Sequence, residues 1–163
     1  MKFVTYTNID GETPRFGFKR DDKIVDVIRS GIWVSENNKD ASFLAVPTTL
    51  KLALGNWDIN FSKLKNLNQA IPDTGLSSLE VDEKPIAIKE SEASLLPPVT
   101  NPDTFRDFYA FEKHVKAARK LRGLKMHPDW YKLPIFYFSN PTTLYGHGEI
   151  VPYPTGTEEL DFE

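Results

Sequence analysis

The sequence predicts an α+β fold in two parts, and three observations support that prediction. Short alternating apolar runs separated by turn signals fill residues 1–30, which is typical of a β-meander. Helical spacing of apolar residues appears twice further along, over 59–71 and 107–123. A proline-rich stretch at 96–103 lies between these two regions and indicates an extended link. We therefore expect a small N-terminal domain of strands and helices, followed by a second domain.

The N-terminal domain, expected over residues 1–90, should begin with the three strands of the meander. The runs "KFVTY", "RFGF" and "KIVDV" supply these strands, and the Asp10-Gly11 pair is a strong hairpin turn signal between the first two. The Ser30-Gly31 pair is expected to end the third strand.

Helical segments should follow the meander, with short strands after them. "DASFLAVPTTLKLALGN" has helical character that Pro47 interrupts, so Thr48 or Thr49 can cap a second piece and Gly55 can end it. "INFSKLKNLNQAI" has its apolar residues at near-helical spacing, which predicts an amphipathic helix that ends at Pro72. "KPIAIK" and "ASLLPPV" are short apolar runs that we expect to be strands or extended connections.

Composition excludes several classes of protein. The 163 residues are 40% hydrophobic and 26% charged, so a packed core is expected rather than disorder. No apolar run is long enough to cross a membrane, and the N-terminus turns polar too early for a signal peptide. The absence of cysteine excludes disulfides and thiolate chemistry, which fits a cytoplasmic protein. A net charge of −3 argues against general nucleic-acid binding.

A carboxylate and an imidazole are spaced at nearly two helical turns in "DFYAFEKHVKAARKLRG". If 107–123 is one helix, His114 lies about 20° around the axis from Asp107 and about 10 Å further along it. Asp107 in a first helical turn would be held ionised, and an ionised carboxylate suits Mg²⁺ or Ca²⁺. This spacing favours a metal ligand plus a general base. The alternative is an ordinary helix-stabilising Asp beside an exposed His, and the two other histidines, His127 and His147, are expected to be loop residues.

Charge is distributed unevenly along the second half of the chain. From Arg106 to Lys125 there are seven Lys or Arg and two acids, whereas Glu149–Glu163 contains five acids and no base. The basic run is either a solvated helix face, an anion-binding wall or a nucleic-acid helix. The final residues, Leu160–Glu163, alternate apolar and acidic side chains, which predicts a strand. A chain that stops within such a pattern looks interrupted, although a solvated edge strand would show the same alternation of apolar and acidic side chains.

Three segments together resemble the fumarylacetoacetate hydrolase family. They are "TFRDFYAFEKHVKAAR", "LPIFYFSNPT" and "VPYPTGTEELDFE", which occur in the family's order between about 95 and 163. The resemblance implies that 91–163 is the beginning of a β-roll catalytic domain. Family members act on 1,3-dicarbonyl and acylpyruvate-like acids. Most cleave a C–C bond with water, and relatives decarboxylate, dehydrate or isomerise 2-oxo acids.

The resemblance also implies roles for individual residues. Asp107 and Glu163 would be ligands of Mg²⁺ or Ca²⁺, with Mn²⁺ as a further candidate. His114 would be the general base. The residues expected to contact substrate are Tyr109, Arg122 and Tyr137, with Arg122 displaced by one position from the family pattern.

The resemblance further implies that this chain is the N-terminal portion of a longer enzyme. Two carboxylates hold a hard dication weakly, because such ions want six or more oxygens, so we expect the chain alone to be inactive. The implied partners are a small dicarbonyl or 2-oxo acid substrate and a second copy in a homodimer, with no nucleic acid and no membrane. A non-catalytic N-terminal module used for assembly is the alternative from a different functional class.

Overall fold

The computed structural model describes residues 1–8 and 13–159 and has the α+β character that the sequence predicts. The chain divides into two compact units, one made of 1–100 with the segment from 144 onward, and the other of 101–143. The domain boundary expected near residue 90 stays a prediction. In the part of the chain that the structure describes, no helix is both long enough and apolar enough to cross a membrane.

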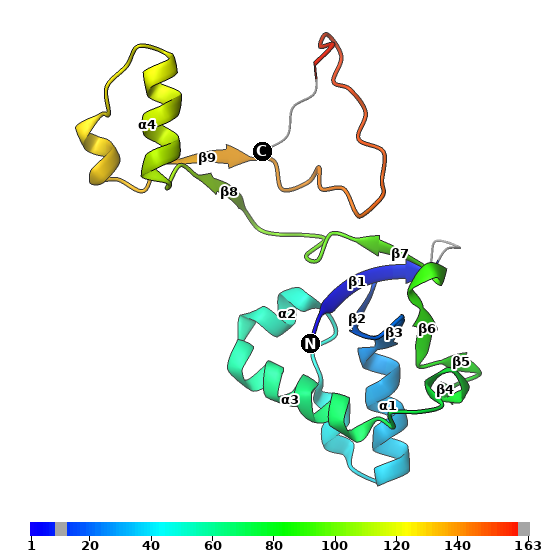
Figure 1. The fold of residues 1–163 in the computed structure, drawn as a ribbon. Helices are drawn as coiled ribbons and strands as arrows, with labels where there is room; N and C mark the ends of the chain where they lie inside the picture. Colours follow the sequence, from blue (N-terminus) through cyan, green and yellow to red (C-terminus); the bar gives the residue numbers. More distant parts are fainter. Residues whose placement is uncertain (9–12, 160–163) are drawn as a thin grey trace. The chain divides into compact units, whose positions relative to one another are not determined.

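A five-stranded antiparallel sheet is the centre of the first unit. The strands are β1 (Phe3–Asn8), β2 (Arg15–Arg20), β3 (Lys23–Asp26), β6 (Ala87–Lys89) and β7 (Ala93–Leu96). Their order is β6-β3-β2-β1-β7, so the first three strands pair consecutively (Figure 1). The meander expected over residues 1–30 is therefore confirmed, although the Asp10-Gly11 turn lies outside the described residues.

Helices follow the meander in the expected region. They are α1 (Val27–Asn38), the 3₁₀ helix η1 (Ala41–Ala45), α2 (Leu50–Gly55) and α3 (Trp57–Ala70). Smaller elements follow, namely η2 (Leu76–Ser78), β4 (Glu80–Val81), β5 (Lys84–Pro85) and η3 (Glu90–Glu92). Thr49 caps α2, because its hydroxyl accepts a hydrogen bond from the Leu52 backbone N–H at 3.1 Å. The interruption at Pro47 and the amphipathic helix expected over 59–71 are both confirmed.

The expectation that Ser30-Gly31 ends a strand is wrong. The strand β3 stops at Asp26, whose carboxylate caps α1, and the helix continues through both residues. Gly31 has a packing role instead, since a Cβ atom there would lie 2.6 Å from the Phe43 backbone oxygen of η1. A glycine that signals a turn in sequence can equally mark a close approach between two helices.

The hydrophobic core forms between the sheet and these helices. Phe16 and Phe18 of β2 are buried against Val34 of α1 and the α3 residues Leu64 and Leu67, which are fully inaccessible. This packing follows from strand and helix periodicity, because residues two apart on β2 and three apart on α3 share one face.

Asp26 is the centre of a buried polar network that joins three elements. Its Oδ2 atom accepts a hydrogen bond from the Tyr6 hydroxyl of β1 at 2.9 Å and pairs with the Arg15 guanidinium of β2. Its Oδ1 atom accepts from the Arg29 backbone N–H in the first turn of α1 at 2.8 Å. Tyr6 and Asp26 are both 2% exposed, so these partners replace water.

This network predicts an alkaline loss of stability that depends on Tyr6. Burial, followed by the charge of Asp26, raises the pKa of Tyr6 well above its usual value of 10.0. Above pH 10.0 the Tyr6 phenol of the unfolded chain releases its proton, while that of the folded chain keeps it. The free energy of unfolding should therefore fall as pH rises. The slope from this one group is at most about 1.4 kcal/mol per pH unit.

Urea unfolding of wild type and Tyr6→Phe between pH 8 and 11 would measure this slope. The Phe variant should be less stable at pH 8 but should lose less stability over the alkaline range. Two curves that stay parallel throughout would contradict the assignment.

The second unit contains a β-hairpin and one α-helix. Strand β8 (Phe105–Phe108) pairs antiparallel with β9 (Phe136–Ser139), while α4 (Glu112–Leu121) and the 3₁₀ helix η4 (Pro128–Tyr131) lie between them in sequence. The apolar segment "LPIFYFSN" contains β9, and two of the large side chains of this strand are exposed rather than buried. Tyr137 is 72% exposed and Phe138 is 65% exposed.

The segment after residue 144 returns to the edge of the first sheet. The His147 backbone N–H donates to the Leu95 carbonyl of β7 at 3.2 Å. Gly146 is required at this approach, because a Cβ atom there would overlap the same Leu95 oxygen. From 144 to 159 the structure contains no helix or strand, and the strand expected at Leu160–Glu163 lies outside the described residues.

Candidate active site

Asp107 lies in strand β8 and not in the first turn of a helix. The helix α4 begins at Glu112, so the single helix expected over 107–123 is wrong at its N-terminal end. Aromatic residues favour strands, and those of β8 face the equally aromatic β9, with Phe108 opposite Phe136. This pairing explains why Phe105–Phe108 form a strand and not the first turn of a helix.

The structure brings the predicted residues together in two pairs. Asp107 is the cross-strand partner of Tyr137, so both side chains leave the hairpin on the same face. Tyr109 and His114 are the second pair, with ring centroids 6.3 Å apart and ring planes at 90°. The helical geometry expected for Asp107 and His114 is lost, and no hydrogen bond or ion pair within the described residues joins these two side chains.

The turn between β8 and α4, residues 109–111, is held by η4. The Trp130 indole N–H donates to the Tyr109 carbonyl at 2.7 Å, and the Tyr109 N–H donates to the Ile135 carbonyl at 3.0 Å. Next to this turn, the Tyr131 hydroxyl donates to a Glu112 carboxylate oxygen at 2.7 Å. Trp130 and Tyr131 were not predicted as site residues, and the one sequence feature that marks them is the Pro-Asp-Trp-Tyr run after His127.

Glu112 is the charged centre of this contact. The Lys116 ammonium lies 2.6 Å from its carboxylate, one helical turn along α4. Hydrogen bonds from Lys116 and then from Tyr131 lower the pKa of Glu112, and the same carboxylate raises the pKa of both partners. The beginning of α4 is therefore fixed to η4 through a negative charge placed where the helix dipole favours it.

The other candidate residues lie in different environments. Arg122 is the C-terminal cap of α4, eight residues after His114, which corresponds to about 12 Å along a helix axis. His127 caps η4, because its Nδ1 atom accepts from the Asp129 N–H at 3.2 Å. His127 and His147 are both loop residues at the starts of turns, as the sequence predicts.

Only part of a metal site can be assigned. Asp107 is exposed and supplies a hard oxygen of the kind that Mg²⁺ and Ca²⁺ prefer. Over residues 1–8 and 13–159, no group of three or more His, Cys, Asp or Glu is placed to hold a metal ion. The second expected ligand, Glu163, lies outside the described residues. The Asp107 carboxylate is thus a suitable ligand for such an ion, but the described residues do not supply enough further ligands to hold it.

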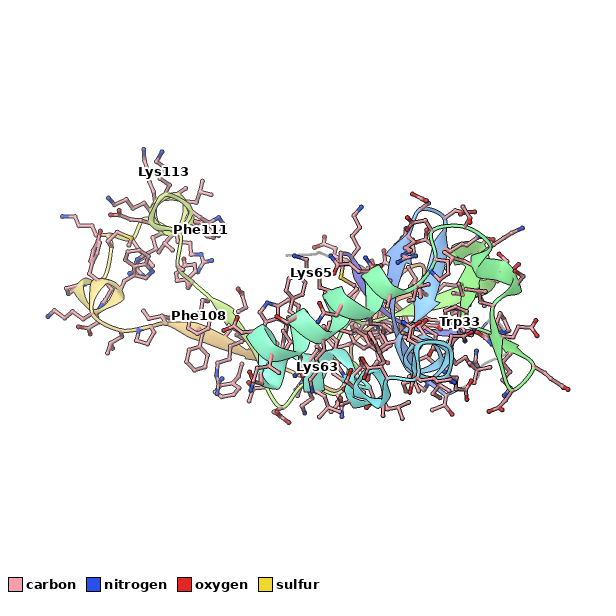
Figure 2. All side chains as sticks on the ribbon, turned by 90° about the horizontal axis from the view of Figure 1, so that it is seen from below. Trp33, Lys63, Lys65, Phe108, Phe111 and Lys113 are labelled. Carbon is pink, nitrogen blue, oxygen red and sulfur yellow. The ribbon has the colours of Figure 1, made fainter. Side chains whose placement is uncertain are left out.

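The basic character of α4 is used partly in local contacts. Lys116 pairs with Glu112, and the Arg119 guanidinium donates to the Lys125 carbonyl at 2.6 Å. Lys113 points away from the helix (Figure 2) and is exposed. These contacts favour a solvated helix face over a continuous nucleic-acid surface, although the anion-binding alternative stays open for the exposed cations.

Comparison with known families finds one matching family model. Residues 103–163 match the model described as "Fumarylacetoacetate (FAA) hydrolase C-terminal". This range contains every residue that the sequence analysis assigns to the site. A search of curated proteins finds no match.

Proposed function

We propose that the chain belongs to the fumarylacetoacetate hydrolase family, because the model of that family's C-terminal domain matches residues 103–163. The family includes hydrolases, isomerases and decarboxylases. We propose that the protein contributes to a metal-dependent hydrolase that cleaves a C–C bond in fumarylacetoacetate-like or acylpyruvate-like 1,3-dicarbonyl acids. The observation that carries this proposal is the ring contact between Tyr109 and His114, which directly follows the strand that carries Asp107.

In this proposal each side chain has one task. His114 takes a proton from the attacking water, and its exposed imidazole is accessible to solvent and substrate. Tyr109 contacts the substrate and the base, while Tyr137 contacts the substrate from the strand opposite Asp107. Arg122 holds a substrate carboxylate, since a guanidinium binds carboxylates with two parallel hydrogen bonds. The β8–β9 hairpin would be the beginning of the β-roll.

Asp107 and Glu163 would hold the divalent cation together with further oxygen ligands. When bound, the cation would polarise the carbonyl under attack and stabilise the negative charge of the leaving enolate. The hydroxide formed from the water would add to that carbonyl, and the C–C bond would then break with its electron pair going to the enolate. The enolate would take up the proton that His114 removed from the water, so the products are a carboxylic acid and a released carbonyl compound. Decarboxylation, dehydration or isomerisation of a 2-oxo acid at the same site is the alternative, and product analysis separates it from hydrolysis.

A second candidate, a module used for assembly, is favoured by one feature of the hairpin. Phe105, Phe108 and Phe138 are between 47% and 65% exposed, which is unusual for side chains of this size. Association of two copies through this surface would agree with the homodimer that the family resemblance implies. Measurement of molar mass in solution tests it without any reference to catalysis.

Metal binding tests the proposal directly. Calorimetric titration of the protein with Mg²⁺ or Mn²⁺ should give an affinity that Asp107→Asn lowers at least about tenfold, because loss of a ligand exceeds the usual effect of an outer-shell change. Asp58→Asn is the matched control, since Asp58 is exposed and lies on α3 outside the matched range. Equal affinities in wild type and Asp107→Asn would remove Asp107 from the site.

A further inference from the structure

The backbone of Tyr109 is fixed from two directions. Its N–H extends the β8–β9 ladder by bonding to the Ile135 carbonyl at 3.0 Å, and its carbonyl accepts from the Trp130 indole at 2.7 Å. A carbonyl at the end of a strand ordinarily turns to water. Here a side chain from η4, more than twenty residues along the chain, satisfies it.

The ring of Tyr109 in turn contacts the imidazole of His114. The perpendicular arrangement at 6.3 Å is the edge-to-face geometry that aromatic rings prefer. His114 is exposed and on the first turn of α4, so few other contacts restrict its rotamer. The Tyr109 ring is the one aromatic neighbour found for this imidazole among the residues that the structure describes.

We propose that Trp130 is a positioning residue for His114, acting through the carbonyl and ring of Tyr109. This inference rests on the proposed function only in giving His114 the role of base. The mechanical link itself is independent of catalysis. The indole N–H fixes the Tyr109 carbonyl and with it the backbone from which the Tyr109 ring projects, and that ring limits the orientations of the imidazole.

The anchoring element is itself built for rigidity. Pro128 is in the first turn of η4 and His127 caps it, while the rings of Trp130 and Tyr131 pack edge to face with centroids 4.9 Å apart. Trp130 is half-buried, so its hydrogen bond is partly shielded from competing water. Tyr131 fixes Glu112 separately, which provides a neighbouring contact for comparison.

The consequence for catalysis is a loss of orientation without a loss of binding. A base that samples several rotamers is within reach of the attacking water for a smaller fraction of the time, which lowers kcat. The proposed substrate contacts at Arg122 and Tyr137 do not depend on the indole, whereas the contact at Tyr109 does. Trp130→Phe should therefore reduce kcat by a larger factor than it raises KM.

Nuclear magnetic resonance of the histidine ring protons tests the link without an activity assay. The chain has three histidines, so His114→Gln identifies the resonances of His114. Tyr109→Leu should shift them, because it removes the neighbouring ring current. Trp130→Phe, which keeps an aromatic ring but removes the N–H, should shift them toward the positions seen in Tyr109→Leu. Trp33→Phe is the matched control, because Trp33 is half-buried like Trp130 but lies on α1 in the other unit, and it should leave these resonances at their wild-type positions.

Each outcome decides between the alternatives. The proposal is overturned if the His114 resonances in Trp130→Phe coincide with those of wild type, or if Tyr109→Leu does not move them. Should Trp130→Phe fail to fold, exchange of the Trp130 indole proton in the wild-type protein replaces it, with slow exchange expected and exchange at the rate of a free indole contradicting the hydrogen bond. If Trp130→Phe shifts the His114 resonances but His114→Ala is fully active, the link between Trp130 and His114 stands and the proposed function is refuted.

Discussion

Replacing Asp26 by alanine is expected to lower the free energy of unfolding of the N-terminal unit by about 3–5 kcal/mol, the usual cost of breaking a buried ion pair. The substitution removes the partner of Arg15, the acceptor of the Tyr6 hydroxyl and the cap of α1 at the same time. Tyr6 is 2% exposed, so its hydroxyl would lose its carboxylate acceptor at a place that water does not reach. Because domains are stable by only about 5–15 kcal/mol in total, this loss is a large fraction of the whole.

Two milder variants separate the contributions. Tyr6→Phe removes one hydrogen bond to the ionised Asp26 carboxylate and should cost about 1.5–3 kcal/mol. Asp26→Asn keeps an acceptor for the Arg29 N–H but loses the charge opposite Arg15. Its cost should therefore lie between those of Tyr6→Phe and Asp26→Ala. Urea unfolding followed by amide exchange in β1 and β2 reports on this unit alone. An Asp26→Ala variant as stable as Tyr6→Phe would show that the network is not energetically coupled.

The N-terminal unit was predictable from local signals, with one exception. Thr49 caps a helix and Pro47 interrupts one, as their chemistry dictates. Helix α1 was missed because two of its residues, Ser30 and Gly31, are the types that commonly end strands. The reason for Gly31 is its approach to the backbone of η1, a contact between segments that no local pattern encodes.

The geometry of the candidate site was not predictable from the sequence. The spacing of Asp107 and His114 was interpreted as one helix, and that interpretation was wrong. The roles of both residues stay predictions. Pairing with β9, about thirty residues later, converts the first part of that segment to a strand. Trp130 was missed for the same physical reason, since its hydrogen bond to Tyr109 is visible only after the chain has folded back.

Under the proposed function, replacing His114 by alanine is expected to lower kcat by roughly 10²–10⁴-fold, the usual contribution of a positioned general base. The attacking water would then have to lose its proton to solvent, and the exposed position of His114 means that little structure is lost with the ring. The free energy of unfolding and the affinity for the divalent cation should therefore both stay close to their wild-type values.

His147→Ala is the matched control for this prediction. His147 is also an exposed histidine within the matched range, and its contact with Leu95 is made by the backbone, which alanine retains. Steady-state kinetics on a panel of 1,3-dicarbonyl acids should show a normal rate for His147→Ala and a low rate for His114→Ala. A near-normal rate for His114→Ala would remove the base from the proposed mechanism, and equal losses in both variants would trace the effect to the surrounding fold. A low rate for His114→Ala alone is the expected result, because the ring contact with Tyr109 orients His114. His147, which lies between two glycines, has no such contact among the described residues.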